Sequence, residues 1–253
     1  MESKIYKQPL YYEIAFSFVN AKMQVDLFEK YIKKFSRIKV KRFLDIGCGP
    51  SLQLKEIARR GYEAVGLDLS SEMLRYLKQK AVEEGIKIET VKANMINFKL
   101  KKKVDFAFIM MGTIGYISSK DFLNHLDSVA ASLKSGGLYL IEDFRLDWTK
   151  KDLFKPQSWI MKRNGIKVKT TFSIKPKDTI NQMLDEAMKL EVNDNGKKCV
   201  FQESSNNKMM FPQEFLELVK MNNKFEFLDW FERFKFKALK KANNDNIAVL
   251  RRK

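Results

Sequence analysis

The sequence predicts a doubly wound α/β fold with a mostly parallel seven-stranded sheet and a small antiparallel β insertion. Three observations lead to this prediction. Strand-length apolar runs alternate with helical patterns between residues 40 and 147, a glycine-rich turn follows the first of these runs, and two Asn-Gly pairs lie between strand-like segments farther along the chain. With 253 residues, 45% of them hydrophobic, the chain has the length for one main domain with an elaboration.

The elements of the predicted core follow from their local patterns. Apolar residues recur at intervals near three, four and seven over residues 10–36, which predicts a helix. Strand-length runs follow in VKRFLDIGCG, EAVGLDLS, IKIETVKANM, VDFAFIMMG and GLYLIEDF, and helical patterns lie between them in LQLKEIARRG, SSEMLRYLKQKAVEEG and DFLNHLDSVAASLKSGG. Strands and helices that alternate at this spacing need crossover connections, so we expect a parallel sheet covered on both faces.

The chain divides into four predicted parts. These are an N-terminal helical segment (residues 1–39), the α/β core (40–155), an antiparallel insertion or lid (156–205) and a C-terminal part (206–253) that completes the core sheet. Asn164-Gly165 and Asn195-Gly196 indicate hairpins in the insertion, since both residues of such a turn need positive φ. In the last part, PQEFLELVKMNN has a helical pattern, and KFEFLDWFERFKF and NIAVLRRK are expected to pair as strands.

Charge and cysteine content limit the classes of partner. The formal net charge of +17 raises nucleic acid as a partner, but the basic residues are scattered over the whole chain, which favours a lysine-rich solvated surface. Cys48 and Cys199 lie far apart and fit no metal-ligand spacing, so we expect neither a disulfide framework nor a metal site. The sequence shows no secretory pattern and no apolar run of membrane-spanning length, and we expect a cytoplasmic protein without a membrane partner.

The turn after the first strand carries the strongest functional signal. Gly47 and Gly49 stand where the first strand of a doubly wound fold meets its first helix, a position at which ligands bind. A dinucleotide fingerprint needs a third glycine where this chain has Leu52. Asp45, just before the turn, disfavours a pyrophosphate and favours a cationic ligand, and Asp68 ends the second strand, where an acid can accept hydrogen bonds from ribose hydroxyls.

These motifs resemble the class I S-adenosylmethionine-dependent methyltransferases. LDIGCGPS, GLDLSSEML, VKANM and LKSGGLYLIED fall in the order and spacing of that family over about residues 40–145, and the hairpin segment before MMFPQEFLELV is similar to the subgroup that methylates small molecules. The resemblance implies a Rossmann-like methyltransferase fold and S-adenosylmethionine as cofactor, with S-adenosylhomocysteine as product. It also implies the cofactor contacts, which are Asp45, Gly47 and Gly49 at the methionine part, Asp68, Leu69 and Met73 at the ribose, Asn94 and Met95 at the adenine, and Met110 at the sulfonium. The family more often has an acid at the position of Asn94, and its Asn-Pro-Pro-Tyr signature is replaced here by MMGTIGY.

The residues that contact the substrate are less clearly marked. Tyr116 follows the fourth strand and either lines the substrate pocket, as a possible proton acceptor, or packs in the core. Glu142, a second candidate for the proton acceptor, and Asp143 end the fifth strand. Tyr12 either anchors the N-terminal helix or closes the pocket, and Trp159 either walls the substrate pocket or packs internally. His125 lies within a predicted helix and is expected to be a packing or surface residue.

The leading hypothesis is direct in-line transfer of a methyl group to a nitrogen, oxygen or carbon of a small molecule. Holding two reactants in line can supply about 7 to 11 kcal/mol of a barrier, which agrees with the lack of an obvious catalytic constellation. An RNA or protein methyltransferase is one alternative. A non-catalytic module that binds the cofactor is the other.

Overall fold

The computed structural model describes residues 4–253 except residues 116, 117, 143, 145, 148 and 151. The helices are α1 (Pro9–Ala15), α2 (Ala21–Phe35), α3 (Leu52–Arg59), α4 (Ser71–Glu83), α5 (Ser119–Ser132) and α6 (Pro212–Asn222). The strands of the larger sheet are β1 (Arg42–Ile46), β2 (Glu63–Asp68), β3 (Ile88–Lys92), β4 (Val104–Ile109), β5 (Leu133–Glu142), β10 (Phe225–Glu232) and β11 (Asn246–Arg252). A second sheet contains β6 (Gln157–Arg163), β7 (Ile166–Asp178), β8 (Met183–Asp194) and β9 (Lys197–Lys208).

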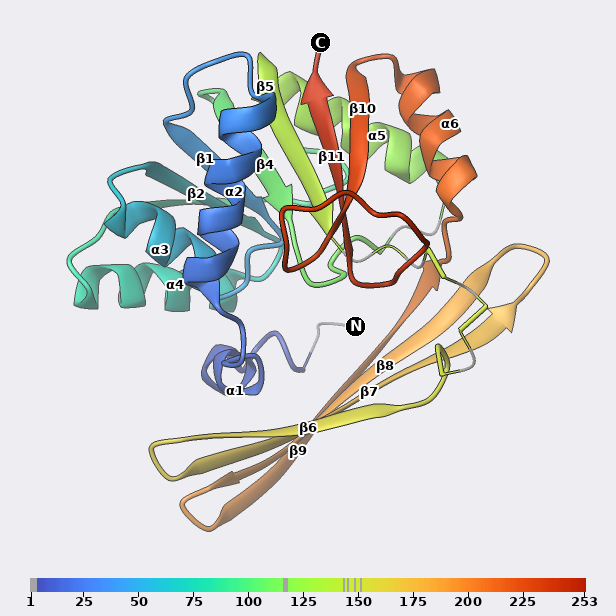
Figure 1. Cartoon of the computed structure of the whole chain (residues 1–253). Coiled ribbons are helices and arrows are strands. Elements are labelled where there is room, and N and C mark those ends of the chain that lie inside the picture. The colour runs from blue at the N-terminus through green and yellow to red at the C-terminus, as the bar shows by residue number, and fades with distance from the viewer. Residues whose placement is uncertain (1–3, 116–117, 143, 145, 148, 151) are drawn as a thin grey trace.

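The larger sheet confirms the predicted fold class. Its seven strands lie in the order β10-β11-β5-β4-β1-β2-β3 (Figure 1). Strands β1 to β5 run parallel, and β11 is antiparallel to both β5 and β10. The carboxyl ends of the parallel strands therefore meet at one edge, which is the edge that faces the second sheet in Figure 1.

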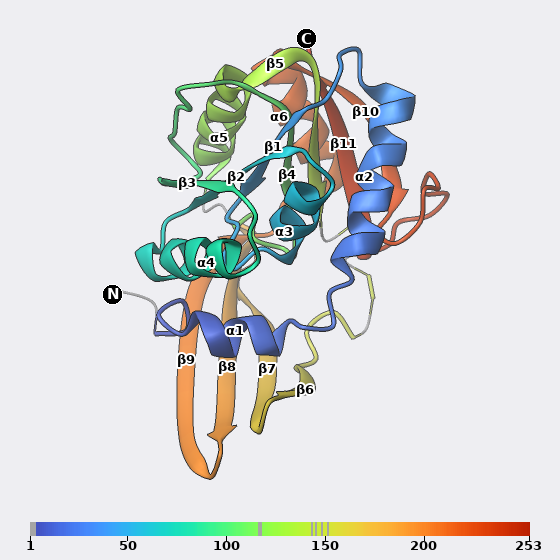
Figure 2. The ribbon, with the colours of Figure 1, turned by 90° about the vertical axis from the view of Figure 1, so that its left-hand side faces the viewer.

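Alternating side chains of the buried strands build two apolar layers. On β4, the rings of Phe106 and Phe108 lie 5.3 and 4.8 Å from the ring of Phe28 on α2. Ala107 and Ile109, which point the other way, belong to the cluster formed with α5 and α6. Helices α2, α3 and α4 thus cover one face of the sheet and α5 and α6 the other. Figure 2 shows α2 and α3 on the side of the sheet opposite α5.

Serine caps start the core helices at the carboxyl edge of the sheet. The hydroxyl of Ser51 accepts a hydrogen bond from the backbone N–H of Leu54 (3.0 Å), and that of Ser70 accepts from the N–H of Met73 (3.3 Å). Each cap satisfies a backbone donor that the first turn of a helix leaves without a partner. Both helices therefore begin beside the ends of the strands that precede them.

The predicted N-terminal helix is divided in two. Residues 16–20 separate α1 from α2, because the side chain of Asn20 accepts a hydrogen bond from the N–H of Met23 (3.0 Å) and so starts a new helix. Helix α2 packs on the larger sheet, whereas Ile14 of α1 belongs to an apolar cluster with Val168 and Leu190 of the second sheet. The strand expected over residues 224–236 is also shorter and ends at Glu232.

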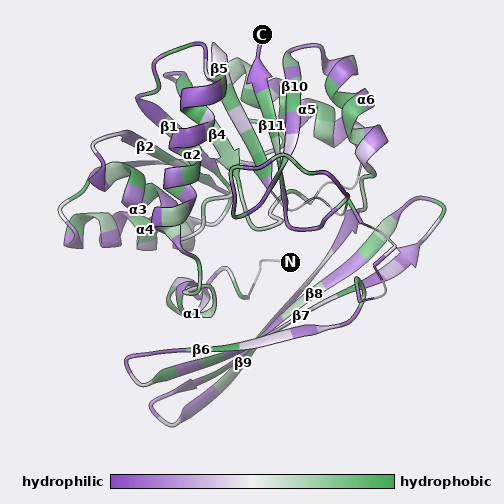
Figure 3. Ribbon diagram, viewed as in Figure 1, coloured by the Kyte–Doolittle hydropathy of each residue, from purple (hydrophilic) through white to green (hydrophobic). Residues whose placement is uncertain are grey.

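The antiparallel insertion is present with its two Asn-Gly hairpins. Asn164 and Gly165 have φ of +49° and +79°, and Asn195 and Gly196 have φ of +48° and +94°. The four long strands extend away from the larger sheet (Figure 1) and alternate between apolar and polar residues along much of their length (Figure 3).

We call the face of this sheet that packs against α1 the inner face. It carries Trp159 and Met161 of β6, Val168, Thr170 and Phe172 of β7, Glu186, Met188, Leu190 and Val192 of β8, and Phe201, Glu203 and Ser205 of β9. Within the described residues, no helix has both the length and the apolar character needed to cross a membrane.

Candidate active site

A cavity of about 610 Å³ opens at the carboxyl ends of β2 and β3. Most of the predicted cofactor residues line it together, namely Gly47, Gly49, Asp68, Leu69, Met73, Asn94 and Met95. Asp45 and Met110 lie on the other side of the glycine turn, where they line a neighbouring cavity of about 60 Å³ with Gly47 and Gly49. The structure thus brings residues from three strand ends into one place.

The glycine turn has backbone conformations and a close packing contact that favour glycine. Gly47 and Gly49 have φ of +67° and +50°, a region that residues with a Cβ atom adopt at a cost. A Cβ atom on Gly47 would also lie 2.4 Å from Cγ2 of Thr113. Both the conformation and the space at position 47 therefore require glycine.

Asp68 joins the end of β2 to two neighbouring segments. Its Oδ2 accepts a hydrogen bond from the N–H of Gly49 (2.7 Å), and its Oδ1 accepts one from the N–H of Ser70 (2.8 Å). Burial raises the pKa of Asp68, and the backbone donors oppose that shift. The backbone N–H of Leu69 also stabilises this carboxylate, but an ionised carboxylate offers about four acceptor positions, so capacity remains for a hydroxyl of a ligand in the adjoining cavity.

Asp45 lies beneath the turn and does not line the 610 Å³ cavity. The side chain is 5% exposed, and its Oδ2 accepts a hydrogen bond from the hydroxyl of Ser51 (2.6 Å). Burial, reinforced by the charge of Asp68, raises the pKa of Asp45 to about 8, although the bond from Ser51 opposes the shift. A nearby cation would favour the ionised form of this carboxyl group.

The segment after β3 is fixed by polar contacts of its own. The side-chain oxygen of Asn94 already accepts a hydrogen bond from the N–H of Ile96 (2.9 Å), so one of its two acceptor positions is used. The carbonyl of Met95 lies 2.7 Å from Nδ1 of His125, and Nε2 of His125 lies 2.6 Å from the hydroxyl of Tyr139.

His125 is a fully buried packing residue, as expected. Burial lowers its pKa to about 4, and the imidazole is neutral at neutral pH. Nδ1 must donate to the carbonyl of Met95, so Nε2 accepts from Tyr139. The histidine therefore holds the Asn94–Met95 segment in place from behind.

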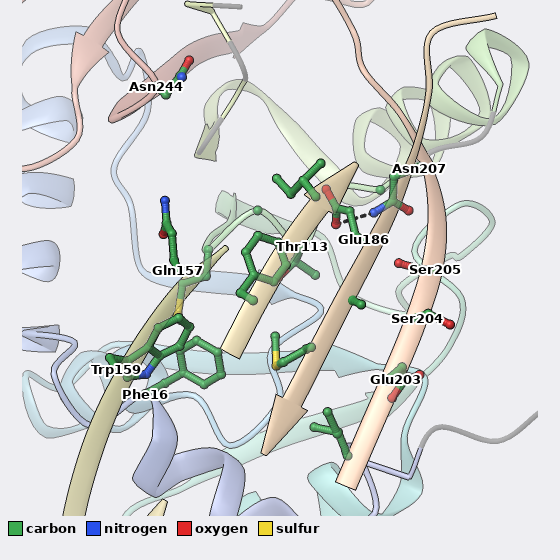
Figure 4. Close-up of a pocket in the computed structure, with 18 of the residues that line it drawn as sticks. Phe16, Thr113, Gln157, Trp159, Glu186, Glu203, Ser204, Ser205, Asn207 and Asn244 are labelled. Atoms are coloured by element: carbon green, nitrogen blue, oxygen red, sulfur yellow. Dashed lines mark hydrogen bonds between the residues drawn. The ribbon is translucent and has the colours of Figure 1, made fainter. Parts of the chain in front are cut away.

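A second cavity, of about 880 Å³, separates the larger sheet from the insertion (Figure 4). Its walls combine aromatic rings of α1 and the following residues with the inner face of the insertion. Trp159 lines this cavity, and its indole N–H donates to the carbonyl of Ala15 (2.7 Å) while its ring packs edge-on against Phe16. Trp159 therefore both walls the cavity and ties the insertion to α1.

The two cavities share one wall, formed by Tyr6, Tyr12, Thr113 and Glu203. Tyr12 stacks at a tilt on Phe16, with ring centroids 4.6 Å apart, and the position of a Cβ atom on Gly49 would lie 3.9 Å from its ring. A group in one cavity is thus separated from a group in the other only by these side chains.

Glu142, one of the two predicted proton acceptors, does not reach this wall. Glu142 is fully buried, accepts a hydrogen bond from the N–H of Met111 (3.0 Å) and forms an ion pair with Arg233. It lines neither cavity, because these contacts hold its carboxylate beneath the end of β4. Tyr116 and Asp143 lie outside the described residues.

Sequence reasoning missed Tyr6, Thr113 and Glu203. Glu203 lies in a polar stretch, QESSNN, whose exposed appearance hides its position. The period of two in β9 offered a signal, since Glu203 shares a face with the apolar Phe201.

Among the described residues, no group of three or more His, Cys, Asp or Glu side chains could hold a metal ion. Cys48 and Cys199 are both free thiols.

Comparisons with known proteins agree with this geometry. Residues 43–137 match the family model of a methyltransferase domain. A ubiquinone biosynthesis O-methyltransferase of Nitrosococcus oceani is 26% identical over 111 residues, which are 44% of this chain and 44% of that protein. The chain spans less than half the length of the curated relatives it matches first, 47% and 44%.

Solved structures extend the likeness to the whole chain. An S-adenosylmethionine-dependent methyltransferase from Clostridium acetobutylicum is similar with a TM-score of 0.77 and 17% identity, and 96% of each chain is covered. The sugar N-methyltransferase KedS8 from Streptoalloteichus sp. is similar with a TM-score of 0.76 and 15% identity, over 100% of this chain and 94% of that one. These likenesses show a common fold. The chain therefore carries a match to a methyltransferase domain over residues 43–137 and shares its fold with S-adenosylmethionine-dependent methyltransferases of known structure.

Proposed function

We propose that the protein transfers the methyl group of S-adenosylmethionine to a nitrogen, oxygen or carbon atom of a small molecule. The observation that carries the proposal is the shared wall, which places the cavity at the strand ends directly beside the 880 Å³ cavity under the insertion. The larger cavity has the size of a pocket that encloses a small ligand. The sugar N-methyltransferase with the same fold supports an acceptor of this size.

The residues at the strand ends fit the cofactor. Gly47 and Gly49 line the cavity at the turn, Asp68 keeps acceptor capacity for a ribose hydroxyl, and Asp45 is a buried carboxyl group whose ionised form a cation would favour. Leu69, Met73, Asn94 and Met95 would border the remainder of the nucleoside. When bound, S-adenosylmethionine supplies an electrophilic methyl group on a sulfonium.

The contribution of the chain is orientation and the exclusion of water. The ring of Tyr12 lies beside the glycine turn. We call the 880 Å³ cavity the acceptor cavity, and Trp159 and Phe16 close its side that faces α1. Reactants that are held in line avoid the entropic cost of encounter. In well-oriented systems this lowers the barrier by about 7 to 11 kcal/mol.

The net charge of +17 keeps an RNA acceptor as the second candidate. Several lysines lie on the outer face of the insertion, opposite the acceptor cavity, at Lys162, Lys167, Lys169, Lys189 and Lys198. A polyanion bound there would be separated from the shared wall by the sheet itself. The position of these lysines therefore favours the small-molecule acceptor.

The test begins with calorimetric titration of S-adenosylmethionine, S-adenosylhomocysteine and, as control, NADH. We expect saturable binding of the first two alone. Transfer of a radiolabelled methyl group is then measured for a panel of amino sugars, sugars and phenols, and for RNA at rising salt. Turnover of a panel member supports the proposal. Methylation of RNA alone, lost steeply as salt rises, would replace it with the second candidate, and cofactor binding without any turnover would leave a binding module.

A further inference from the structure

Glu203 occupies the boundary between the two cavities. It lies on β9 with its side chain on the inner face, opposite Met188 of β8. Figure 4 shows Glu203 across the drawn cavity from Trp159 and Phe16. Of the inner-face carboxylates Glu186 and Glu203, only Glu203 lines both the 610 Å³ and the 880 Å³ cavity.

The other side chains of the shared wall are poor proton acceptors. Burial, together with the charges of Glu203, Asp68 and Glu186, raises the pKa of Tyr6 to about 12. Burial raises the pKa of Tyr12 well above its ordinary range. Both phenols therefore stay protonated at neutral pH. The hydroxyl of Thr113 is not an acid in this range, and it donates to the carbonyl of Met110 at 2.7 Å.

The surroundings of Glu203 leave its carboxylate ready to take a proton. Its Oε2 is buried and has no hydrogen-bond partner within the described part of the chain. Burial raises the pKa of Glu203, and the backbone N–H of Ile5 opposes the shift. The ionisable groups that line the same cavities include Tyr6, Lys7 and Tyr12 of the N-terminal segment, Asp68 of β2, Glu72 of α4, Lys92 of β3, Lys150, Asp152 and Lys155 after β5, and Glu186 of β8.

Glu186 provides a contrast on the same face. It lies on β8 in the row next to Glu203 and lines the acceptor cavity. Its Oε2 accepts a hydrogen bond from the side-chain amide of Asn207 (2.6 Å), and it does not line the cavity at the strand ends. Two carboxylates of equal charge on one surface thus differ in position and in hydrogen bonding.

We propose that Glu203 is the catalytic base of the transfer, an inference that rests on the proposed function. The O–H or N–H bond of the acceptor breaks, and its proton passes to the carboxylate of Glu203. The electron pair of that bond stays on the acceptor atom and forms its new bond to the methyl carbon, while the pair of the carbon–sulfur bond remains on sulfur. Charge and atoms balance without a further reactant. Glu203 then releases the proton to water and regains its ionised form.

The first experiment compares Glu203→Gln with Glu186→Gln in the methyl-transfer assay, using the panel acceptor that the wild-type protein methylates. Removal of a general base typically costs about 10²- to 10⁴-fold in rate, so we expect a loss of that size in kcat for Glu203→Gln. Affinity for S-adenosylhomocysteine should stay within about twofold. The base must be ionised, so kcat/KM of the wild type for the acceptor, measured at saturating S-adenosylmethionine throughout, should rise with pH to a plateau. Glu186→Gln should keep this acidic limb, and Glu203→Gln should lose it.

Glu203→Asp separates the chemical role from a structural one. It retains a carboxylate at a shorter reach, so we expect partial activity and a retained acidic limb, whereas a purely structural role would affect the Asp and Gln variants alike. Thermal unfolding of all three variants checks that they fold. Retention of kcat within about threefold in Glu203→Gln, with the acidic limb unchanged, would overturn the proposal.

A second measurement does not depend on the acceptor. The Glu203 carboxyl group is titrated by ¹³C NMR in the complex with S-adenosylhomocysteine, with its signal assigned by its loss in Glu203→Gln. A pKa above the ordinary range of glutamate supports the assignment, and an ordinary pKa contradicts it. If the wild type binds S-adenosylmethionine but methylates no acceptor, the proposed function fails, and the titration still decides whether the carboxylate is placed as argued.

Discussion

The contact between Gly47 and Thr113 allows a quantitative test of the glycine turn. In Gly47→Ala, a residue with a Cβ atom would hold a φ of +67°, which costs about 1 to 2 kcal/mol. The new methyl group would also lie 2.4 Å from Cγ2 of Thr113, and overpacking of this kind costs about 1 to 3 kcal/mol. We therefore expect Gly47→Ala to lower the free energy of unfolding by roughly 2 to 5 kcal/mol.

Thr113→Ser separates the two contributions. It removes Cγ2 and keeps the hydroxyl that donates to the carbonyl of Met110. In the double variant the steric contribution disappears and the backbone contribution remains, so the two substitutions should be coupled by about 1 to 3 kcal/mol. Urea unfolding of the wild type, both single variants and the double variant measures this energy. Coupling below about 0.5 kcal/mol would refute the steric argument, since distant and independent sites add to that accuracy.

Three further predictions concern titration and the cofactor. The pKa of His125 falls from 6.5 to about 4 on folding, so the free energy of unfolding should drop by up to about 3 kcal/mol as the pH falls from 6.5 to 4, and His125→Gln should show a weaker dependence in urea unfolding at pH 7.5 and 5. The pKa of Asp45 is about 8 and a cationic ligand favours its ionised form, so affinity for S-adenosylmethionine should rise from pH 6.5 to 8 in calorimetry, and a flat profile in the wild type would contradict this role. Asp68→Asn leaves one acceptor oxygen for the N–H groups of Gly49 and Ser70 and for the ribose, so affinity for S-adenosylhomocysteine should fall about 10- to 100-fold; unchanged affinity in a folded variant would remove Asp68 from the site.

The core of the fold could be predicted because its signals are local. Periodicity and glycine positions specify the alternation of strands and helices, and the two Asn-Gly turns specify hairpins whose φ values the structure confirms. The division of the N-terminal helix could not be read from periodicity. It depends on the cap at Asn20 and on the packing of Ile14 against the insertion, a contact between segments about 150 residues apart.

The candidate site shows the same division between local and distant information. Gly47, Asp68 and Met95 were expected at the strand ends, and the structure groups them around one cavity. The position of Glu142 depended on Arg233, about 90 residues later, whose ion pair holds the carboxylate away from the cavities. The inward direction of Glu203 depended on the register of β9 with β8, which no short motif records.

The alternation of faces in the insertion has a consequence for acceptor specificity. Glu186 and Met188 of β8 and Glu203 and Ser205 of β9 lie on the inner face and line the acceptor cavity, whereas Lys189 and Lys198 lie on the opposite face. Substitutions at alternate positions, such as Met188 and Ser205, can reshape the pocket while the strand pairing is preserved. A deletion of one residue in either strand would reverse the faces beyond it and exchange the pocket lining for the solvent-facing lysines. If the proposed function holds, diversification of this protein for new acceptors should therefore proceed by point substitution in the strands, and changes of length should be confined to the turns.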